Sequence, residues 1–155
     1  MSASSDLGIK IRPMDEDEPG EDGFVAGVWQ TSFREDMHRS SQRHPAYQAI
    51  KPALKALIRR QVNALLAKPG TVVLLASNPE DDQHFLGFIA YEAQSDLLIV
   101  HYLYVKQIYR KMGVGRALLE AACGTAQRPI IYTHRTFKGA AYMAKAGALY
   151  MPHMT

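Results

Sequence analysis

The feature that most constrains the fold of this chain is a basic corner with two glycines, RKMGVG, at residues 110–115. It follows the apolar stretch LLIVHYLYV, which is typical of a buried strand, and leads directly into a run of good helix formers, ALLEAA. Glycine is unfavourable inside a strand or a helix. Gly113 and Gly115 therefore indicate a turn from strand to helix at which the backbone must be free of side chains.

This corner also has the chemistry of an anion-binding site. Free backbone N–H groups and the positive end of the helix dipole meet at the start of a helix, and glycine lets a phosphate approach them closely. Arg110, Lys111 and Arg116 add positive charge at the same point. A dinucleotide fold would require G-x-G-x-x-G and a P-loop would require Lys-Ser or Lys-Thr after the glycines, so both fit poorly. The corner predicts a pyrophosphate site, with a purely structural turn as the alternative.

Apolar residues with periods of two and of about 3.6 divide the chain into short strands and helices. Strands are predicted at residues 8–14, 71–77, 84–94, 96–106, 128–135 and 148–154, of which the third and fourth form a hairpin. Helices are predicted at residues 23–36, 47–70, with Pro52 in the first turn, 115–123 and 137–147. An acidic loop at 15–22 precedes the first helix, and a flexible loop at about 34–46 follows it. The order β-α-α-β-β-β-α-β-α-β predicts an α/β fold with a mixed sheet covered by helices.

The length and composition are those of one folded domain spanning residues 1–155. Hydrophobic residues make up 47% of the chain, yet no apolar run approaches the roughly 18 residues of a membrane span. The first residues lack the pattern of a secretory signal, and the single cysteine, Cys123, excludes an internal disulfide and a thiolate-rich metal site. The six histidines show no metal-ligand spacing. We therefore expect a cytoplasmic protein without a metal, in which Cys123 is an ordinary buried side chain.

Charge is distributed unevenly along the chain. Residues 1–22 hold seven acidic and two basic residues, so residues 23–155 hold eight acidic and sixteen basic ones. A basic body suits an anionic partner such as a polyphosphate cofactor or nucleic acid. Lys51, Lys55 and Arg59 recur every four residues in the second predicted helix, where they indicate contact with an anionic partner or a solvated helix face.

The segment VKQIYRKMGVGRALLEAA resembles the cofactor motif [QR]-x-x-G-x-[GA] of the GNAT acyltransferase superfamily, with Arg110, Gly113 and Gly115 at the three specified positions. The order of elements is also similar to that of the GNAT fold. The resemblance implies an acetyl-CoA or coenzyme A site and the transfer of an acetyl or other short acyl group to an amine by direct attack in a ternary complex. It implies that the cofactor contacts Leu103, Tyr104, Val105, Arg110, Lys111, Met112, Gly113, Val114, Gly115 and Arg116.

Acyl transfer to an amine also calls for a general base and a general acid. Candidate bases are Glu92, a solvated strand-end residue in the alternative interpretation, and His101, a structural histidine in its alternative. The third candidate is His134, which follows a predicted strand at the end where ligands tend to bind, so that contact with the acceptor or the cofactor is its other role. Many GNAT enzymes carry the acid as a tyrosine four residues before a Gly-aromatic pair, and here that position holds Met143, with Tyr142 beside it. Thr136 stands near the place of an Asn in the same motif. The acid role of Tyr142 is therefore open.

Other functions are compatible with the same residues. The displaced tyrosine favours a GNAT-like fold without transfer chemistry, serving as a component of a larger assembly, and the basic helix favours a nucleic-acid-binding module. VHYLYVK and the terminal segments YTHRT and ALYMPHM also resemble GNAT-like proteins encoded by bacteriophages, which implies a place in the host cytoplasm or the virion. The amine acceptor, whether a small molecule, a protein or nucleic acid, and the oligomeric state, including a homodimer, are left open.

Overall fold

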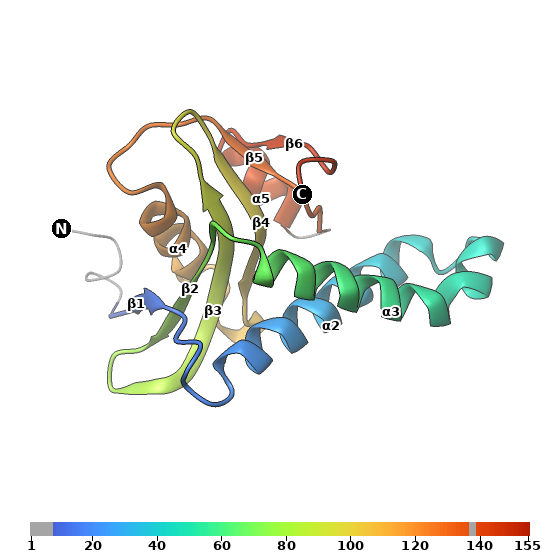
Figure 1. The fold of residues 1–155 in the computed structure, drawn as a ribbon, viewed down its shortest axis with the longest axis horizontal. Helices are drawn as coiled ribbons and strands as arrows, with labels where there is room; N and C mark the ends of the chain where they lie inside the picture. The colour runs from blue at the N-terminus through green and yellow to red at the C-terminus, as the bar shows by residue number, and fades with distance from the viewer. Residues whose placement is uncertain (1–7, 137–138) are drawn as a thin grey trace.

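A computed structural model describes residues 8–136 and 139–155, and it shows a six-stranded sheet with helices on both faces (Figure 1). The strands are β1 (Lys10–Pro13), β2 (Thr71–Asn78), β3 (Asp81–Ala93), β4 (Leu98–Val105), β5 (Ile130–Tyr132) and β6 (Leu149–Tyr150). The helices are α2 (Glu21–Ser41), α3 (Pro45–Ala67), α4 (Val114–Cys123), α5 (Gly139–Lys145) and the single 3-10 turn η1 (Gln107–Tyr109). The predicted order of strands and helices and the mixed α/β class are confirmed.

The strands lie in the sheet in their chain order. β1 to β4 are antiparallel neighbours, which confirms the predicted hairpin of β3 and β4, and β5 is parallel to β4. A parallel neighbour requires a crossover connection, and the glycine corner with α4 forms that connection. The predicted corner is therefore the point where the chain leaves the antiparallel part of the sheet.

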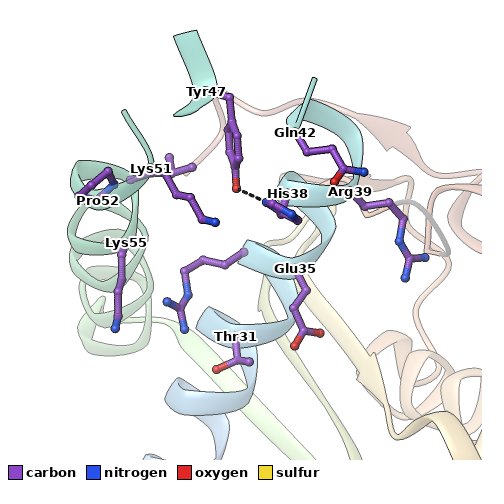
Figure 2. A pocket seen from close by; sticks show the side chains of 11 residues that line it. Thr31, Glu35, His38, Arg39, Gln42, Tyr47, Lys51, Pro52 and Lys55 are labelled. Atoms are coloured by element: carbon purple, nitrogen blue, oxygen red, sulfur yellow. Dashed lines mark hydrogen bonds between the residues drawn. The ribbon is translucent and has the colours of Figure 1, made fainter. Parts of the chain in front are cut away.

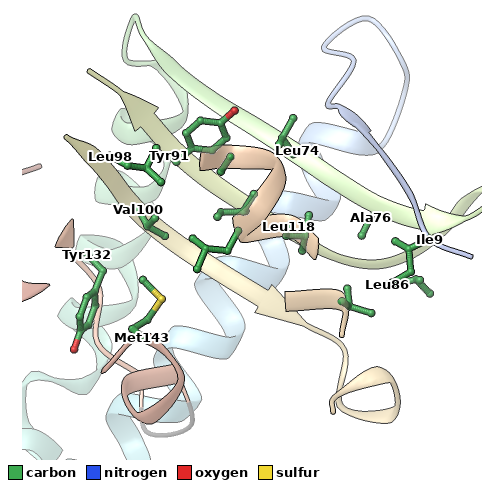
Figure 3. Close-up of a cluster of buried hydrophobic side chains, with 14 residues drawn as sticks. Ile9, Leu74, Ala76, Leu86, Tyr91, Leu98, Val100, Leu118, Tyr132 and Met143 are labelled. Carbon is green, nitrogen blue, oxygen red and sulfur yellow. The ribbon is translucent and has the colours of Figure 1, made fainter. Parts of the chain in front are cut away.

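Each face of the sheet carries its own core, as the period-two pattern of the strands requires. In β2, Val73 and Leu75 pack toward α2 and α3, while Leu74 and Ala76 pack toward α4. Figure 3 shows the second of these cores, in which Leu118 of α4 and Met143 of α5 lie against the sheet. The helices thus cover both faces, and β4 lies between the two cores.

The predicted loop at 34–46 is wrong for residues 34–41 and 45–46, because α2 continues to Ser41 and α3 begins at Pro45. No glycine or proline lies between Gly27 and Pro45 to end the helix, and α3 packs along it as the second arm of a helical hairpin. The hairpin extends well beyond the sheet (Figure 1). The prediction that Pro52 lies in the first turn of this helix is wrong, because α3 begins at Pro45 and Pro52 lies inside it. No helix within the described residues is both long and apolar enough to cross a membrane.

The predicted acidic loop ends earlier than expected, because Glu21 opens α2 and is buried. Its carboxylate accepts two hydrogen bonds from Arg12 of β1, at 2.9 and 2.8 Å, and one from the backbone N–H of Asp15. The Arg12 hydrogen bonds hold the pKa of Glu21 below its usual range despite burial. This buried pair ties the first strand to the start of α2.

Candidate active site

β4 and β5 pair over only three residues and then separate. Leu98 to Val100 of β4 lie opposite Ile130 to Tyr132 of β5. The backbone N–H of Thr133 donates to the carbonyl of Val100 at 3.1 Å, and β5 ends there. β4 continues to Val105, so within the described residues its second half has no strand beside it on the β5 side. An opening between two parallel strands is therefore built into the sheet.

A β-bulge at His101 lies at the point where the two strands separate. Ala90 of β3 pairs with Tyr102 and Tyr91 pairs with Val100, which leaves His101 as an extra residue in β4. Two residues apart in a regular strand share a face, yet Val100 packs in the α4 core and Tyr102 in the α2 core. The bulge thus reverses which face each later side chain of β4 reaches.

The peptide groups of Leu103 and Val105 point into the opening. The N–H of Lys106 donates to the carbonyl of Leu86 in β3, and peptide groups alternate in direction along a strand. The groups of Leu103 and Val105 therefore face away from β3. In agreement with this, the carbonyl of Val105 accepts a hydrogen bond from Arg110 Nε at 3.0 Å.

The glycine corner has different requirements at its two glycines. Gly113 is the N-cap of α4 with φ of 85°, a left-handed conformation that favours glycine. A Cβ on Gly115 would meet only ordinary contacts, with Val105 at 3.6 Å and with Leu103 and Tyr142 at 3.9 Å. The backbone conformation therefore explains Gly113, whereas packing does not require a glycine at position 115. At Gly115 the absence of a side chain leaves the first turn of α4 open to a bound group.

The three residues predicted separately as bases belong to one buried chain of hydrogen bonds. Lys68 Nζ lies 3.2 Å from Glu92 Oε2, which is 2.6 Å from His101 Nε2. His101 Nδ1 lies 2.9 Å from Thr133 Oγ1, which is also 2.9 Å from His134 Nδ1. Glu92 is only 6% exposed, so its interpretation as a solvated strand-end residue is wrong.

The environment sets the charge state of this chain. Burial lowers the pKa of His101, and the hydrogen bond and charge of Glu92 oppose that effect only in part. Burial acts to raise the pKa of Glu92, but the hydrogen bonds and charges of His101 and Lys68 together lower it by more, so the net shift is downward. Glu92 is therefore a carboxylate and His101 is neutral near pH 7.

His134 lies at the other end of the chain inside an aromatic enclosure. The rings of Trp29 and Phe33 from α2 approach it edge-on at 5.4 and 5.0 Å, and Tyr102 lies at 6.2 Å. Burial and then the charge of His101 lower its pKa to about 4. Its Nε2 atom is buried and has no hydrogen-bond partner among the described residues. That nitrogen is therefore a buried polar atom that makes no hydrogen bond to the described residues, and aromatic rings surround it.

A small cavity of about 30 Å³ lies where β4 and β5 separate. Its walls come from β4, from the end of β5 and from α5, and they include His101, Leu103, His134, Thr136 and Met143. Such a volume accommodates about one or two water molecules. The cavity lies between the candidate base and the open edge of β4.

The remaining predicted residues border this region. Tyr142 lies on α5 with its ring against the first turn of α4, and burial raises its pKa, so it stays protonated near neutral pH. Thr136 Oγ1 accepts from the N–H of Gly139 at 2.9 Å and so caps α5. Cys123 is half-buried, less enclosed than predicted, and burial raises the pKa of its thiol. Lys111, Met112 and Arg116 are exposed around the corner, while Val114 is buried.

The basic stripe of α3 is separate from this site. Lys51 and Lys55 line an open cleft of about 790 Å³ between α2 and α3, with Tyr47 bonded to His38 across it (Figure 2). Arg59 is exposed outside the cleft. Thr31 faces the cleft from α2, about 200° around the helix from Trp29 and Phe33. The cleft and His134 therefore lie on opposite faces of α2, and the role of the stripe in anion binding stays a prediction.

Sequence reasoning missed Thr133, Lys68 and the aromatic enclosure. Thr133 directly precedes His134, but its bond to His101 depends on the register of β4 and β5. Lys68 follows the last turn of α3 and has no local feature that marks it. Trp29 and Phe33 lie within the helix predicted at residues 23–36, and nothing in the sequence marks them as neighbours of His134. Their contacts with Tyr102 of β4 and with His134, both more than 60 residues later in the chain, were not encoded in any local pattern.

The comparisons with known proteins agree with this arrangement. Residues 70–151 match the family model described as acetyltransferase (GNAT) domain, and the chain belongs to this family. A search of curated protein sequences finds no significant match. Among solved structures, the chain is similar to a GCN5-related N-acetyltransferase from Ralstonia eutropha, with 18% identity, a TM-score of 0.55 and coverage of 96% of this chain and 97% of that one.

Two further structures share the fold and were solved with ligands. The PaiA N-acetyltransferase from Thermoplasma acidophilum in complex with coenzyme A has 17% identity, a TM-score of 0.52 and coverage of 89% and 87%. An aminoglycoside acetyltransferase from an uncultured soil metagenomic sample, in complex with sisomicin, has 14% identity, a TM-score of 0.52 and coverage of 92% and 88%. Coenzyme A binding is thus documented within the family to which this chain belongs.

The two glycines should respond oppositely to alanine. Gly113→Ala forces a side chain into a left-handed conformation and should lower the free energy of unfolding by about 1 kcal/mol. Gly115→Ala should raise it by up to about 1 kcal/mol, because its Cβ fits and alanine favours the helix. Urea denaturation of both variants tests this. Equal losses in the two variants would contradict the different roles assigned to them.

The protein should become less stable as the pH falls below 6.5, because His134 is neutral in the folded state. Its pKa is about 4 when folded, against an ordinary value of 6.5. Below pH 6.5 the unfolded chain binds a proton that the folded chain refuses, so stability is full above pH 6.5 and is lost as the pH falls to 4. The loss should be about 3 kcal/mol. His134→Asn should lack this part of the loss in denaturation measured at pH 7 and pH 4, and an unchanged pH dependence would refute the assignment.

Proposed function

We propose that this protein is an acyl-CoA-dependent N-acyltransferase that moves an acetyl or other short acyl group to an amine. The observation that carries the proposal is the opening between β4 and β5, which has the glycine corner at one end and the unpartnered Nε2 of His134 beside it. Membership of the GNAT family supports the reaction class. The rival, a GNAT-like fold without transfer chemistry, gives no reason for an open strand edge and an unoccupied buried nitrogen at the same place.

The residues of the corner fit coenzyme A. The first helical hydrogen bond of α4 runs from the N–H of Ala117 to the carbonyl of Gly113, which leaves earlier N–H groups free for a pyrophosphate. Lys111 and Arg116 are exposed beside them, and Gly115 offers bare backbone. The open edge of β4 from Leu103 to Val105 would hold the pantetheine arm through the peptide groups of Leu103 and Val105, with Tyr104 between them.

When bound, acetyl-CoA supplies a thioester whose carbonyl carbon an amine can attack, with release of the CoA thiol. We assign the oxyanion contact to the backbone N–H of Leu103 or Val105, which faces the opening. His134 Nε2 accepts the proton that the amine loses, and Tyr142 donates one toward the thiolate side of the site. The cavity must widen to admit an acyl group, and the flexible side chain of Met143 lines it.

Binding of acetyl-CoA is the first test. At one hundred times its dissociation constant, acetyl-CoA should add about 2.7 kcal/mol to the stability of the native protein, seen as a rise in melting temperature. Gly115→Asp should abolish this rise, because a carboxylate would occupy the place of the pyrophosphate and repel it, while a helix start tolerates an acidic residue.

Gly115→Ala is the matched control, since it adds a side chain at the same position without charge. It should keep most of the rise. If millimolar acetyl-CoA leaves the melting temperature of the natural protein unchanged, the acyltransferase proposal fails and the rival is favoured.

Tyr142 can be tested separately from binding. Tyr142→Phe should reduce the rate of acetyl transfer by roughly 100-fold, the typical contribution of one general acid. The acetyl-CoA-dependent rise in melting temperature should be preserved, because the ring remains against α4. Transfer can be followed as thiol release with sisomicin as the amine probe. An undiminished rate in the variant would remove Tyr142 from the mechanism.

A further inference from the structure

Three hydrogen bonds connect Glu92 to His134 through His101 and Thr133. Only one assignment of donors and acceptors satisfies all three. An ionised carboxylate only accepts, so His101 Nε2 carries the proton of the 2.6 Å bond to Glu92. His101 is neutral, so its Nδ1 is an acceptor and Thr133 donates its hydroxyl proton to it at 2.9 Å. The Thr133 oxygen is then free to accept from His134 Nδ1–H, also at 2.9 Å. His134 Nε2 is thereby left as a lone pair, and it is the buried atom without a partner.

We propose that Glu92, His101 and Thr133 are positioning residues that form a proton relay behind His134. They hold His134, which lines the cavity, in the tautomer whose Nε2 carries no proton, and they carry away the proton that this nitrogen receives. This inference rests on the proposed acyltransferase function for the identity of the proton donor, an amine. The direction of the relay follows from the four hydrogen-bonded side chains together with an ionised Glu92 and a neutral His101.

The relay balances as a shift of protons along existing hydrogen bonds. When His134 Nε2 takes a proton from the attacking amine, its Nδ1 proton passes to Thr133 Oγ1, and the hydroxyl proton of Thr133 passes to His101 Nδ1. His134 ends neutral and His101 ends as an imidazolium beside the Glu92 carboxylate. The positive charge thus moves from an apolar enclosure to a carboxylate, which favours it.

The surroundings of the two histidines agree with this direction of transfer. His134 faces aromatic rings from α2, Met143 from α5 and the titratable side chains of His101, Tyr102 and Tyr132, and the shift of its pKa has no contribution from a carboxylate. The charge of Asp36 on α2 acts on the neighbouring Tyr102. His101 contacts Glu92 directly, and Lys68 binds the same carboxylate from the end of α3. When the two histidines together take up one extra proton, His101 therefore holds it better than His134.

The tautomers can be measured by nitrogen NMR of the whole protein labelled at histidine, with no substrate present. In the natural protein, His134 should carry its proton on Nδ1 and His101 on Nε2, and acid titration should protonate His101 before His134. Thr133→Val should lower the ratio of the Nδ1–H to the Nε2–H form of His134 by about fivefold or more, the ratio that one ordinary hydrogen bond corresponds to. Thr133→Ser, which restores the hydroxyl, should return the ratio to that of the natural protein.

Glu92→Gln tests the relay at a distance, because an amide can donate as well as accept. Glu92→Gln should therefore allow either assignment of donors and acceptors along the hydrogen bonds. It should shift the His134 tautomer, although Thr133 and His101 lie between the two residues. Thr71→Val is the matched control. It removes a buried hydroxyl that has no hydrogen-bond partner among the described residues, directly opposite Glu92 in the sheet, and should leave His134 unchanged.

The outcomes separate this inference from the proposed function. A His134 protonated on Nε2 in the natural protein, or one that ignores both Thr133→Val and Glu92→Gln, overturns the relay whether or not acetyl-CoA binds. Correct tautomers without an acetyl-CoA effect on melting temperature support the relay and reject the acyltransferase. In transfer assays with sisomicin, Glu92→Gln should also move the acidic limb of the kcat/KM profile to lower pH, because the proton on His101 loses its counter-charge.

Discussion

The hydrogen bond between His101 and Glu92 is the interaction on which the rest of the site depends. A carboxylate as buried as Glu92 is stable only with close partners, and it finds them in His101 and Lys68. His101 reaches it as the extra residue of a β-bulge, and that bulge moves Tyr102 onto the α2 face of the sheet. Tyr102 then stacks on Trp29 at 5.2 Å and helps to enclose His134. One buried hydrogen bond thereby connects the shape of β4 with the surroundings of the candidate base.

The parts of the molecule that were predictable from sequence are those that depend on local patterns. Alternation along β2, β3 and β4 reflects two covered faces, and the glycine corner reflects the conformation of Gly113, so these elements were found at nearly their true bounds. The loop at 34–46 was wrong because residues 34–41 are polar and helical. Their helix is held by packing of Phe33 and Met37 on the sheet side and by α3 along its length, and not by a pattern of its own.

The hydrogen-bond chain was not predictable because it joins three strands. Glu92 and His101 were candidate bases in the sequence, and Thr133 directly precedes a third, His134. Their contact, however, depends on the register of β3 against β4 and of β4 against β5. A slip of one residue in either pair would turn these side chains to the opposite face. A single sequence shows the alternation of a strand but not its register. It therefore gave candidates one by one, and the structure assembled them.

The position of the site on the sheet follows from the same residues. Gly115 and Tyr142 belong to the α4 face, whereas His134 and its aromatic enclosure belong to the α2 face. In a fully paired sheet β4 and β5 would close together and separate the two sides. Here the pairing ends at Val100 and Tyr132, and the next residue, Thr133, bonds to His101 and His134 through its side chain. The hydroxyl that directs the proton chain therefore lies at the point where the strands part, which brings the base within reach of a group bound along the other face.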